Sequence, residues 1–198
     1  FWRGAEAVAG IVALDAGLGW PSHWLGYVQV ADVEALVGKA MAYGALPLHP
    51  PTDAPDGRFA VLADPDGAAL GLVSGGPAGN APPIGPGAFV WDELLTEDDA
   101  VRGFYARALG YAVAPSDMGA LGSGWVLRVD GLPVASILRS PLATPPFWLP
   151  YVAGDPDAAA ARVGALGGRV LQEVVELEET GRFVVLEDPH GAAFGVLR

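Results

Sequence analysis

Two stretches of this chain recur at one fixed separation, and this repeat limits the fold more than any other feature. The pentapeptide WLGYV at 24–28 returns as WLPYV at 148–152. The segment RFAVLADPDGAALGLV at 58–73 returns as RFVVLEDPHGAAFGVL at 182–197, with 10 of 16 positions identical. Both pairs lie 124 positions apart. A shared separation of this kind indicates duplication of one structural module.

The last module, residues 147–197, carries a local signal for each of its elements. Asp155-Pro156 provides an N-cap and a proline at the first helical position, and Gly167-Gly168 provides the stop. The turn Asp188-Pro189-His190-Gly191 joins the last two strands. The sequence therefore predicts the order strand, helix and three strands, with the strands at 147–153, 169–175, 182–187 and 192–197.

Residues 89–139 predict the same order from a different sequence. A strand at 89–95 precedes a helix that Thr96 and the acidic residues after it open and that Gly110 ends. Three strands follow at 111–114, 125–129 and 134–139, and Asp130-Gly131 forms the hairpin turn. Residues 24–73 copy the last module, so we refer to 24–73, 89–139 and 147–197 as the second, third and fourth modules.

The start of the chain resembles only the end of a module. Val8-Ala9-Gly10-Ile11 echoes Val134-Ala135-Ser136-Ile137, so residues 1–14 are expected to hold the last strands of a first module. If the modules have equal lengths, we expect about 39 residues of an opening strand and helix to be absent before it. We expect an incomplete N-terminal domain at 1–74, a Pro/Gly linker at 75–87 and a C-terminal domain at 88–198.

Composition excludes several classes of function. Hydrophobic residues make up 52% of the chain, charged residues make up 17%, and the net charge is −12. This field disfavours nucleic acid and anionic membranes as partners. The absence of cysteine excludes disulfides and thiolate chemistry. No signal peptide or long apolar run is visible, so a cytoplasmic location is expected.

Several motifs together resemble one protein family. They are FYARALGY at 104–111, DPDAAAARVGALGGRV at 155–170, and the DPxGA turns that begin at Asp64 and Asp188. The chain is similar to the glyoxalase, bleomycin-resistance and extradiol dioxygenase superfamily, also called vicinal oxygen chelate proteins, and to its two-domain actinobacterial glyoxalase-like members. The resemblance implies an α+β fold in which tandem βαβββ modules form curved mixed sheets that cup a cavity.

Metal-dependent members of that superfamily place ligands on the first and last strands of each module. The positions that match in this sequence are Val90, Trp148, Gly195 and the neighbourhood of Ser136, with Trp24, Gly71 and about Gly10 in the N-terminal half. None of these side chains is a suitable ligand for a divalent ion. His23, His49 and His190 lack the spacing of a cluster. We therefore expect no metal and no cofactor.

Trp24 and Trp148 occupy equivalent places in the repeat, and two interpretations stay open. Each indole is either a flat wall on which a planar ligand stacks or a filler for space that no metal occupies. Strand alternation places Asp92 on the same face as Val90, toward the expected cavity. Asp92 is then either a ligand anchor or acid/base group, or a surface carboxylate paired with an arginine.

Two classes of function follow. The first is a metal-free protein that binds an aromatic or amphipathic small molecule, such as a secondary metabolite or antibiotic, through Trp148, Asp92, Val90 and Trp24. The alternative is a glyoxalase-like lyase, hydroxylase or dioxygenase-type enzyme that acts on a small carbonyl or aromatic substrate. The expected partner is a small molecule, with association of two copies of the chain left open.

Overall fold

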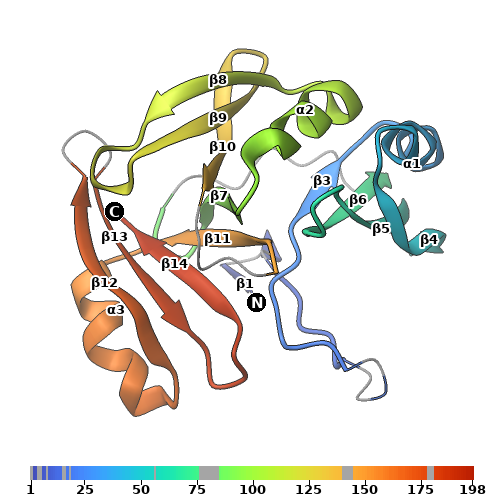
Figure 1. Ribbon diagram of the computed structural model, residues 1–198. Coiled ribbons are helices and arrows are strands. Elements are labelled where there is room, and N and C mark those ends of the chain that lie inside the picture. The colour runs from blue at the N-terminus through green and yellow to red at the C-terminus, as the bar shows by residue number, and fades with distance from the viewer. Residues whose placement is uncertain are drawn as a thin grey trace. The chain divides into compact units, whose positions relative to one another are not determined.

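The computed structural model describes residues 2–3, 6–7, 9–14, 17, 19–55, 57–75, 85–139, 145–177 and 181–198 (Figure 1). Its contacts divide the chain into two compact units. Unit 1 combines Phe1–Trp24, Asn80–Trp91 and Leu149–Arg198, and unit 2 combines Leu25–Gly79 with Asp92–Trp148. Open sheets with few helices make up both units, which confirms the expected α+β fold class.

The second module lies in unit 2 and forms a four-stranded sheet. Its elements are β3 (Tyr27–Gln29), α1 (Val33–Ala42), β4 (Leu46–Ala54), β5 (Gly57–Ala63) and β6 (Ala69–Gly75). The strand order is β3-β6-β5-β4, and β3 runs parallel to β6. Asp32 caps α1 by accepting the Ala35 amide at 2.9 Å. Val33, Val37 and Ala40 are buried, so one apolar face of α1 packs against the sheet.

The third module supplies the other strands of unit 2. Its elements are β7 (Phe89–Thr96), η2 (Asp99–Val101), α2 (Arg102–Phe104), the π-helical turn η3 (Tyr105–Leu109), β8 (Ala112–Asp117), η4 (Gly119–Leu121), β9 (Ser123–Val129) and β10 (Leu132–Arg139). The strand order is β7-β10-β9-β8. The helix ends at Gly110 as predicted, with a left-handed φ of 81°. Its N-cap is Asp98, two residues after the predicted Thr96.

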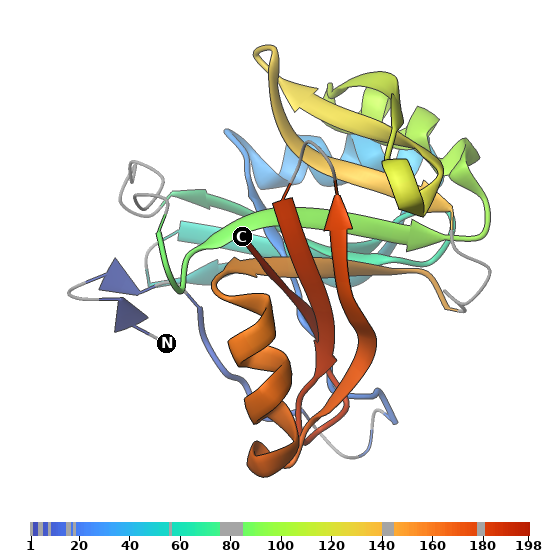
Figure 2. The same cartoon turned by 90° about the vertical axis from the view of Figure 1, so that its left-hand side faces the viewer.

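The fourth module lies mainly in unit 1. Its elements are β11 (Phe147–Ala153), α3 (Pro156–Val163), η5 (Gly164–Leu166), β12 (Arg169–Leu177), β13 (Gly181–Glu187) and β14 (Ala193–Leu197), with the strand order β12-β13-β14-β11. Asp155 accepts the amides of Asp157 and Ala158 and so caps α3. Figure 2 shows α3 lying along β12 and β13. The helix contacts both strands, and its Val163 belongs to the apolar cluster that they share.

The beginning of the chain differs from the expectation. β1 (Trp2–Arg3) and β2 (Glu6–Ala7) form a separate two-stranded ladder. Residues 9–14 form neither helix nor strand, so Gly10 does not occupy a last-strand position. The physical reason is that an extended segment needs a hydrogen-bonded neighbour to persist as a strand, and no described strand pairs with this one.

The two compact units are defined by contacts between residues, so neither unit is one continuous stretch of the sequence. Unit 2 takes residues from both halves of the sequence, and β7 begins in unit 1 and continues into unit 2. The division at 1–74 and 88–198 stays a prediction from the repeat. Most of the predicted linker 75–87 lies outside the described residues. Among the helices described, none is long and apolar enough to cross a membrane.

A buried hydrogen-bond chain ties the second module to the third inside unit 2. Asp64, which is 1% exposed, opens the first DPxG turn. One of its oxygens accepts the backbone amides of Asp66, Gly67 and Ala68 at 2.8–2.9 Å. The other accepts the Tyr105 hydroxyl at 2.6 Å. The equivalent Asp188 of the fourth module accepts only backbone amides among the bonds described, and it is half-buried.

Asp64 and Asp188 occupy equivalent positions in the repeat but differ in their hydrogen-bond partners, so the same substitution can be compared at both. Asp64→Asn turns the oxygen that faces Tyr105 into an N–H donor, which leaves the buried Tyr105 hydroxyl proton without an acceptor. We expect a loss of about 1–3 kcal/mol in the free energy of unfolding. Asp188→Asn keeps its backbone bonds and should change stability by less than about 0.5 kcal/mol. Urea titrations of both variants measure the difference, and equal losses would contradict this assignment.

Candidate functional site

Unit 2 contains a cavity of about 210 Å³ with a mostly apolar wall. Its lining comes from β3, β6, β7, the helical turn η3 and β10, together with Trp148. The lining residues are Gly26, Tyr27, Val28, Leu70, Asp92, Tyr105, Leu109, Tyr111, Val134, Ala135 and Trp148. Clefts with apolar walls and few polar groups are the usual form of small-molecule sites.

Strand β7 directs Asp92 into this cavity. In the parallel pairing of β7 with β10, Asp92 lies beside Ala135 and Glu93 lies beside Ser136. Successive side chains of a strand point to opposite faces. Asp92 and Ala135 line the cavity, whereas buried Glu93 accepts a hydrogen bond from the Ser136 hydroxyl at 3.1 Å. The two adjacent carboxylates therefore have separate environments.

Asp92 has an unusual electrostatic environment for a carboxylate. No arginine, lysine or histidine is among the described residues that line the cavity. Burial raises the pKa of Asp92 to about 6. Burial and, secondarily, the charge of Asp92 also raise the pKa of Tyr111. Asp92 therefore changes its charge close to neutral pH, while Tyr111 stays neutral there.

Trp148 is held in place by Tyr105. The two rings meet edge to face, with centroids 5.4 Å apart and an interplanar angle of 89°. The indole N–H donates to the Tyr105 hydroxyl oxygen at 3.2 Å, and that hydroxyl donates to Asp64. Trp148 also packs against the core cluster of unit 2. Trp148 thus lines the cavity and also packs against the core, and its role as a stacking surface for a ligand stays a prediction.

Trp24 and Val90 belong to unit 1, and neither lines the cavity of unit 2. Trp24 contacts Phe89 and Phe194 edge to face, at centroid distances of 5.6 and 6.4 Å. Val90 is half-buried in β7. The structure therefore brings Trp148 and Asp92 together but places the repeat equivalent of Trp148 among other aromatic rings.

Tyr27, Tyr105 and Tyr111 also line the cavity, and the sequence had not marked them as site residues. The sequence held one indication that Tyr27 matters, because Tyr151 occupies the same position in the other copy of the repeat. In the structure Tyr27 pairs with Gly71, and Tyr151 pairs with Gly195. A side-chain carbon added at either glycine would lie less than 2.5 Å from the tyrosine ring. Each tyrosine ring therefore occupies the space that a side chain at its paired glycine would need.

This arrangement bears on the metal that the fold family implies. Two of the expected last-strand positions are glycines covered by tyrosine rings. Within the described ranges, no group of three or more His, Cys, Asp or Glu side chains could hold an ion. His49 stacks on Phe59, and His23 contacts the Pro21 carbonyl. These donor sets do not fit a divalent ion.

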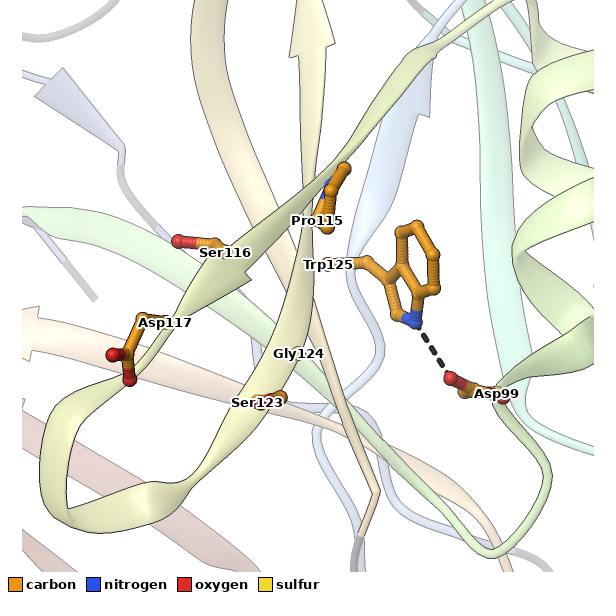
Figure 3. A pocket seen from close by; sticks show the side chains of 7 residues that line it. All are labelled: Asp99, Pro115, Ser116, Asp117, Ser123, Gly124 and Trp125. Carbon is orange, nitrogen blue, oxygen red and sulfur yellow. Dashed lines mark hydrogen bonds between the residues drawn. The ribbon is translucent and has the colours of Figure 1, made fainter.

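A second, more open pocket of about 370 Å³ lies beside β8 and β9 (Figure 3). It is lined by Asp99, Pro115, Ser116, Asp117, Ser123, Gly124 and Trp125. The Trp125 indole N–H donates to Asp99 at 2.6 Å. Arg102 pairs with Asp99 and lies over the Trp125 ring at 4.3 Å. Trp125 and Arg102 already occupy the Asp99 carboxylate, and the other carboxylate of the lining, Asp117, is exposed. This pocket is therefore a weaker candidate than the cavity that contains Asp92.

Sequence comparison adds independent relatives. Residues 88–197 match the family described as the glyoxalase-like domain. "Putative glyoxylase CFP32" of Mycobacterium tuberculosis is 36% identical over 200 residues, which covers 98% of this chain and 77% of that protein. "Anthracycline biosynthesis protein DauV" of a Streptomyces species is 37% identical over 186 residues, which covers 90% of this chain and 66% of that protein.

Solved structures agree on the fold. The 2,3-dioxygenase LapB from Pseudomonas sp. KL28 aligns with a TM-score of 0.56 at 16% identity, over 86% of this chain and 69% of that chain. A catechol 2,3-dioxygenase aligns with a TM-score of 0.56 at 13% identity, over 87% of this chain and 67% of that chain. At such low identity the likeness shows the fold alone.

The raised pKa of Asp92 gives a pH-dependent prediction. Its folded-state pKa of about 6 lies above the unfolded value of about 3.9. The charged form is thus disfavoured in the fold, and the contribution of Asp92 to stability falls as pH rises from about 4 through 6. Asp92→Asn removes this slope. We expect the variant to gain about 1–3 kcal/mol over the unchanged protein between pH 4 and pH 7.

Urea unfolding at the two pH values measures this gain, because the other carboxylates contribute equally to both proteins. Asp92→Leu serves as a second variant that also lacks the charge. A stability difference that stays constant between pH 4 and pH 7 in both variants would show that Asp92 is not a desolvated carboxylate.

Proposed function

The chain belongs to the glyoxalase-like family, and from this premise we propose that it binds a small, largely apolar organic molecule in the cavity of unit 2, without a metal. The observation that carries this proposal is one cavity with an aromatic and aliphatic wall and a single carboxylate, Asp92. Trp148 provides the ring surface, and Asp92 provides the polar contact.

The cavity favours a ligand of modest size. Its volume of about 210 Å³ is below the roughly 300–1,000 Å³ of sites for drug-sized molecules. It would therefore hold a small molecule or one ring of a larger one. The name of the Streptomyces relative, which refers to anthracycline biosynthesis, supports an aromatic ligand class.

A metal-dependent lyase or dioxygenase is less well supported by these residues. Such enzymes use a metal to polarise substrate oxygens, and tyrosine rings cover the glycines at two expected ligand positions. One observation favours a different catalytic role as a second candidate. With its pKa of about 6, Asp92 is suited to accept a proton from a bound molecule near neutral pH.

A catalytic role for Asp92 as a base requires proton exchange that depends on this residue. If Asp92 acts as a base, hydrogen–deuterium exchange at the carbon beside the carbonyl of a bound ketone should accelerate as pH rises through about 6. The exchange should fall to the uncatalysed rate in Asp92→Asn. An exchange rate that is the same with and without the protein would remove this candidate.

The binding proposal is tested by calorimetric titration with 2-naphthol. The two fused rings can contact Trp148, and the hydroxyl can donate to Asp92. Trp148→Phe keeps a ring but reduces its area and removes the indole N–H, so we expect affinity to fall about 2- to 10-fold. Phenylalanine is used because Trp148→Ala would leave a void in a packed site.

Trp125→Phe is the matched control, since Trp125 lines the other pocket of unit 2. It should leave 2-naphthol affinity unchanged. Asp92→Asn should weaken 2-naphthol more than naphthalene, which has no hydroxyl. Saturable binding that Trp125→Phe abolishes and Trp148→Phe leaves intact would place the ligand in the wrong pocket and refute the proposal.

A further inference from the structure

Four aromatic side chains line the cavity of unit 2 from separate elements. Tyr27 comes from β3, Tyr105 from η3, Tyr111 from the segment after η3, and Trp148 from β11. Aromatic faces carry partial negative charge and attract cations. A group of tyrosine and tryptophan rings around one space is the arrangement that recognises quaternary ammonium groups in proteins.

The charge in this cavity has one sign. Asp92 is the acidic residue of the lining, and no basic residue accompanies it among the described lining residues. The tyrosines remain neutral at physiological pH, because burial raises the pKa of each of them. The chain as a whole carries a net charge of −12. An anionic ligand would therefore meet repulsion, whereas a cation would neutralise Asp92.

We propose that this cavity recognises an organic cation with a methylated or quaternary ammonium group, which contacts the aromatic side chains of the lining and whose charge Asp92 balances. The inference deepens the proposed function and rests on it. It names the ligand class that the same cavity takes, where the proposed function requires only a small apolar molecule.

The polar groups of the lining favour a methylated ammonium over a primary one. A primary ammonium has three N–H donors, and each needs an acceptor when it leaves water. The Tyr105 hydroxyl already donates to Asp64 and accepts from Trp148. The side-chain acceptors that remain in the lining are Asp92 and the hydroxyl oxygens of Tyr27 and Tyr111, and they come from separate elements. A quaternary ammonium has no N–H group, so its binding leaves no donor unsatisfied.

The test compares choline with its uncharged carbon isostere, 3,3-dimethylbutan-1-ol. The two molecules share their shape and hydroxyl group and differ in charge. By calorimetric titration at pH 8, we expect choline to bind about tenfold or more tightly than the alcohol. Asp92→Asn should reduce this preference, because only the aromatic rings then attract the cation, and it should weaken choline more than the alcohol. At pH 5, where Asp92 is mostly protonated, choline affinity should fall about tenfold.

Asp117→Asn is the control for net charge. Asp117 is exposed and lines the other pocket, so this variant changes the total charge by the same amount as Asp92→Asn. It should leave choline affinity unchanged. Circular dichroism of both variants establishes that they fold. An equal loss in both variants would show that only the overall field attracts choline, and it would overturn the inference.

The outcomes separate this inference from the proposed function. Equal affinity for choline and the alcohol overturns the cation inference and leaves a small-molecule site intact. The same conclusion follows if 2-naphthol binds and neither of the two probes does. If none of the three molecules binds, the inference and the proposed function both fail.

Discussion

The buried carboxylate of Asp64 is the interaction on which the arrangement of unit 2 depends. It accepts three backbone amides of its own turn and the hydroxyl of Tyr105, 41 positions further along the chain. Tyr105 in turn accepts the Trp148 indole N–H. A buried polar group left without a partner costs about 1–3 kcal/mol. This cost fixes the rotamer of Tyr105 and, through it, the position of the cavity wall.

Local sequence signals account for most of the secondary structure. The Asp155-Pro156 cap, the Gly110 stop and the DPxG turns act over a few residues, so they can be recognised without knowledge of tertiary contacts. Alternation along β7 also places Asp92 correctly on the face opposite Glu93. The start of the chain could not be predicted in this way, because a strand depends on a distant partner.

The composition of the cavity depends on contacts that the sequence does not reveal. Trp24 and Trp148 are equivalent in the repeat, yet Trp148 meets a tyrosine of the third module, whereas Trp24 meets Phe89 and Phe194. The repeated motif therefore reports a shared backbone and not a shared environment. The tyrosine–glycine pairs are the exception, since both copies preserve Tyr27 with Gly71 and Tyr151 with Gly195. Their repetition was the available sign that rings occupy the expected ligand positions.

The central claim is that the ligand lies between Trp148 and Asp92, and a crystal structure of the 198-residue chain soaked with choline and, separately, with 2-naphthol tests it most directly. The account predicts ligand density in the cavity lined by both residues, with the ammonium of choline within reach of the Asp92 carboxylate. Density for both ligands in the Trp125 pocket, with the Asp92 cavity filled only by water, would contradict it.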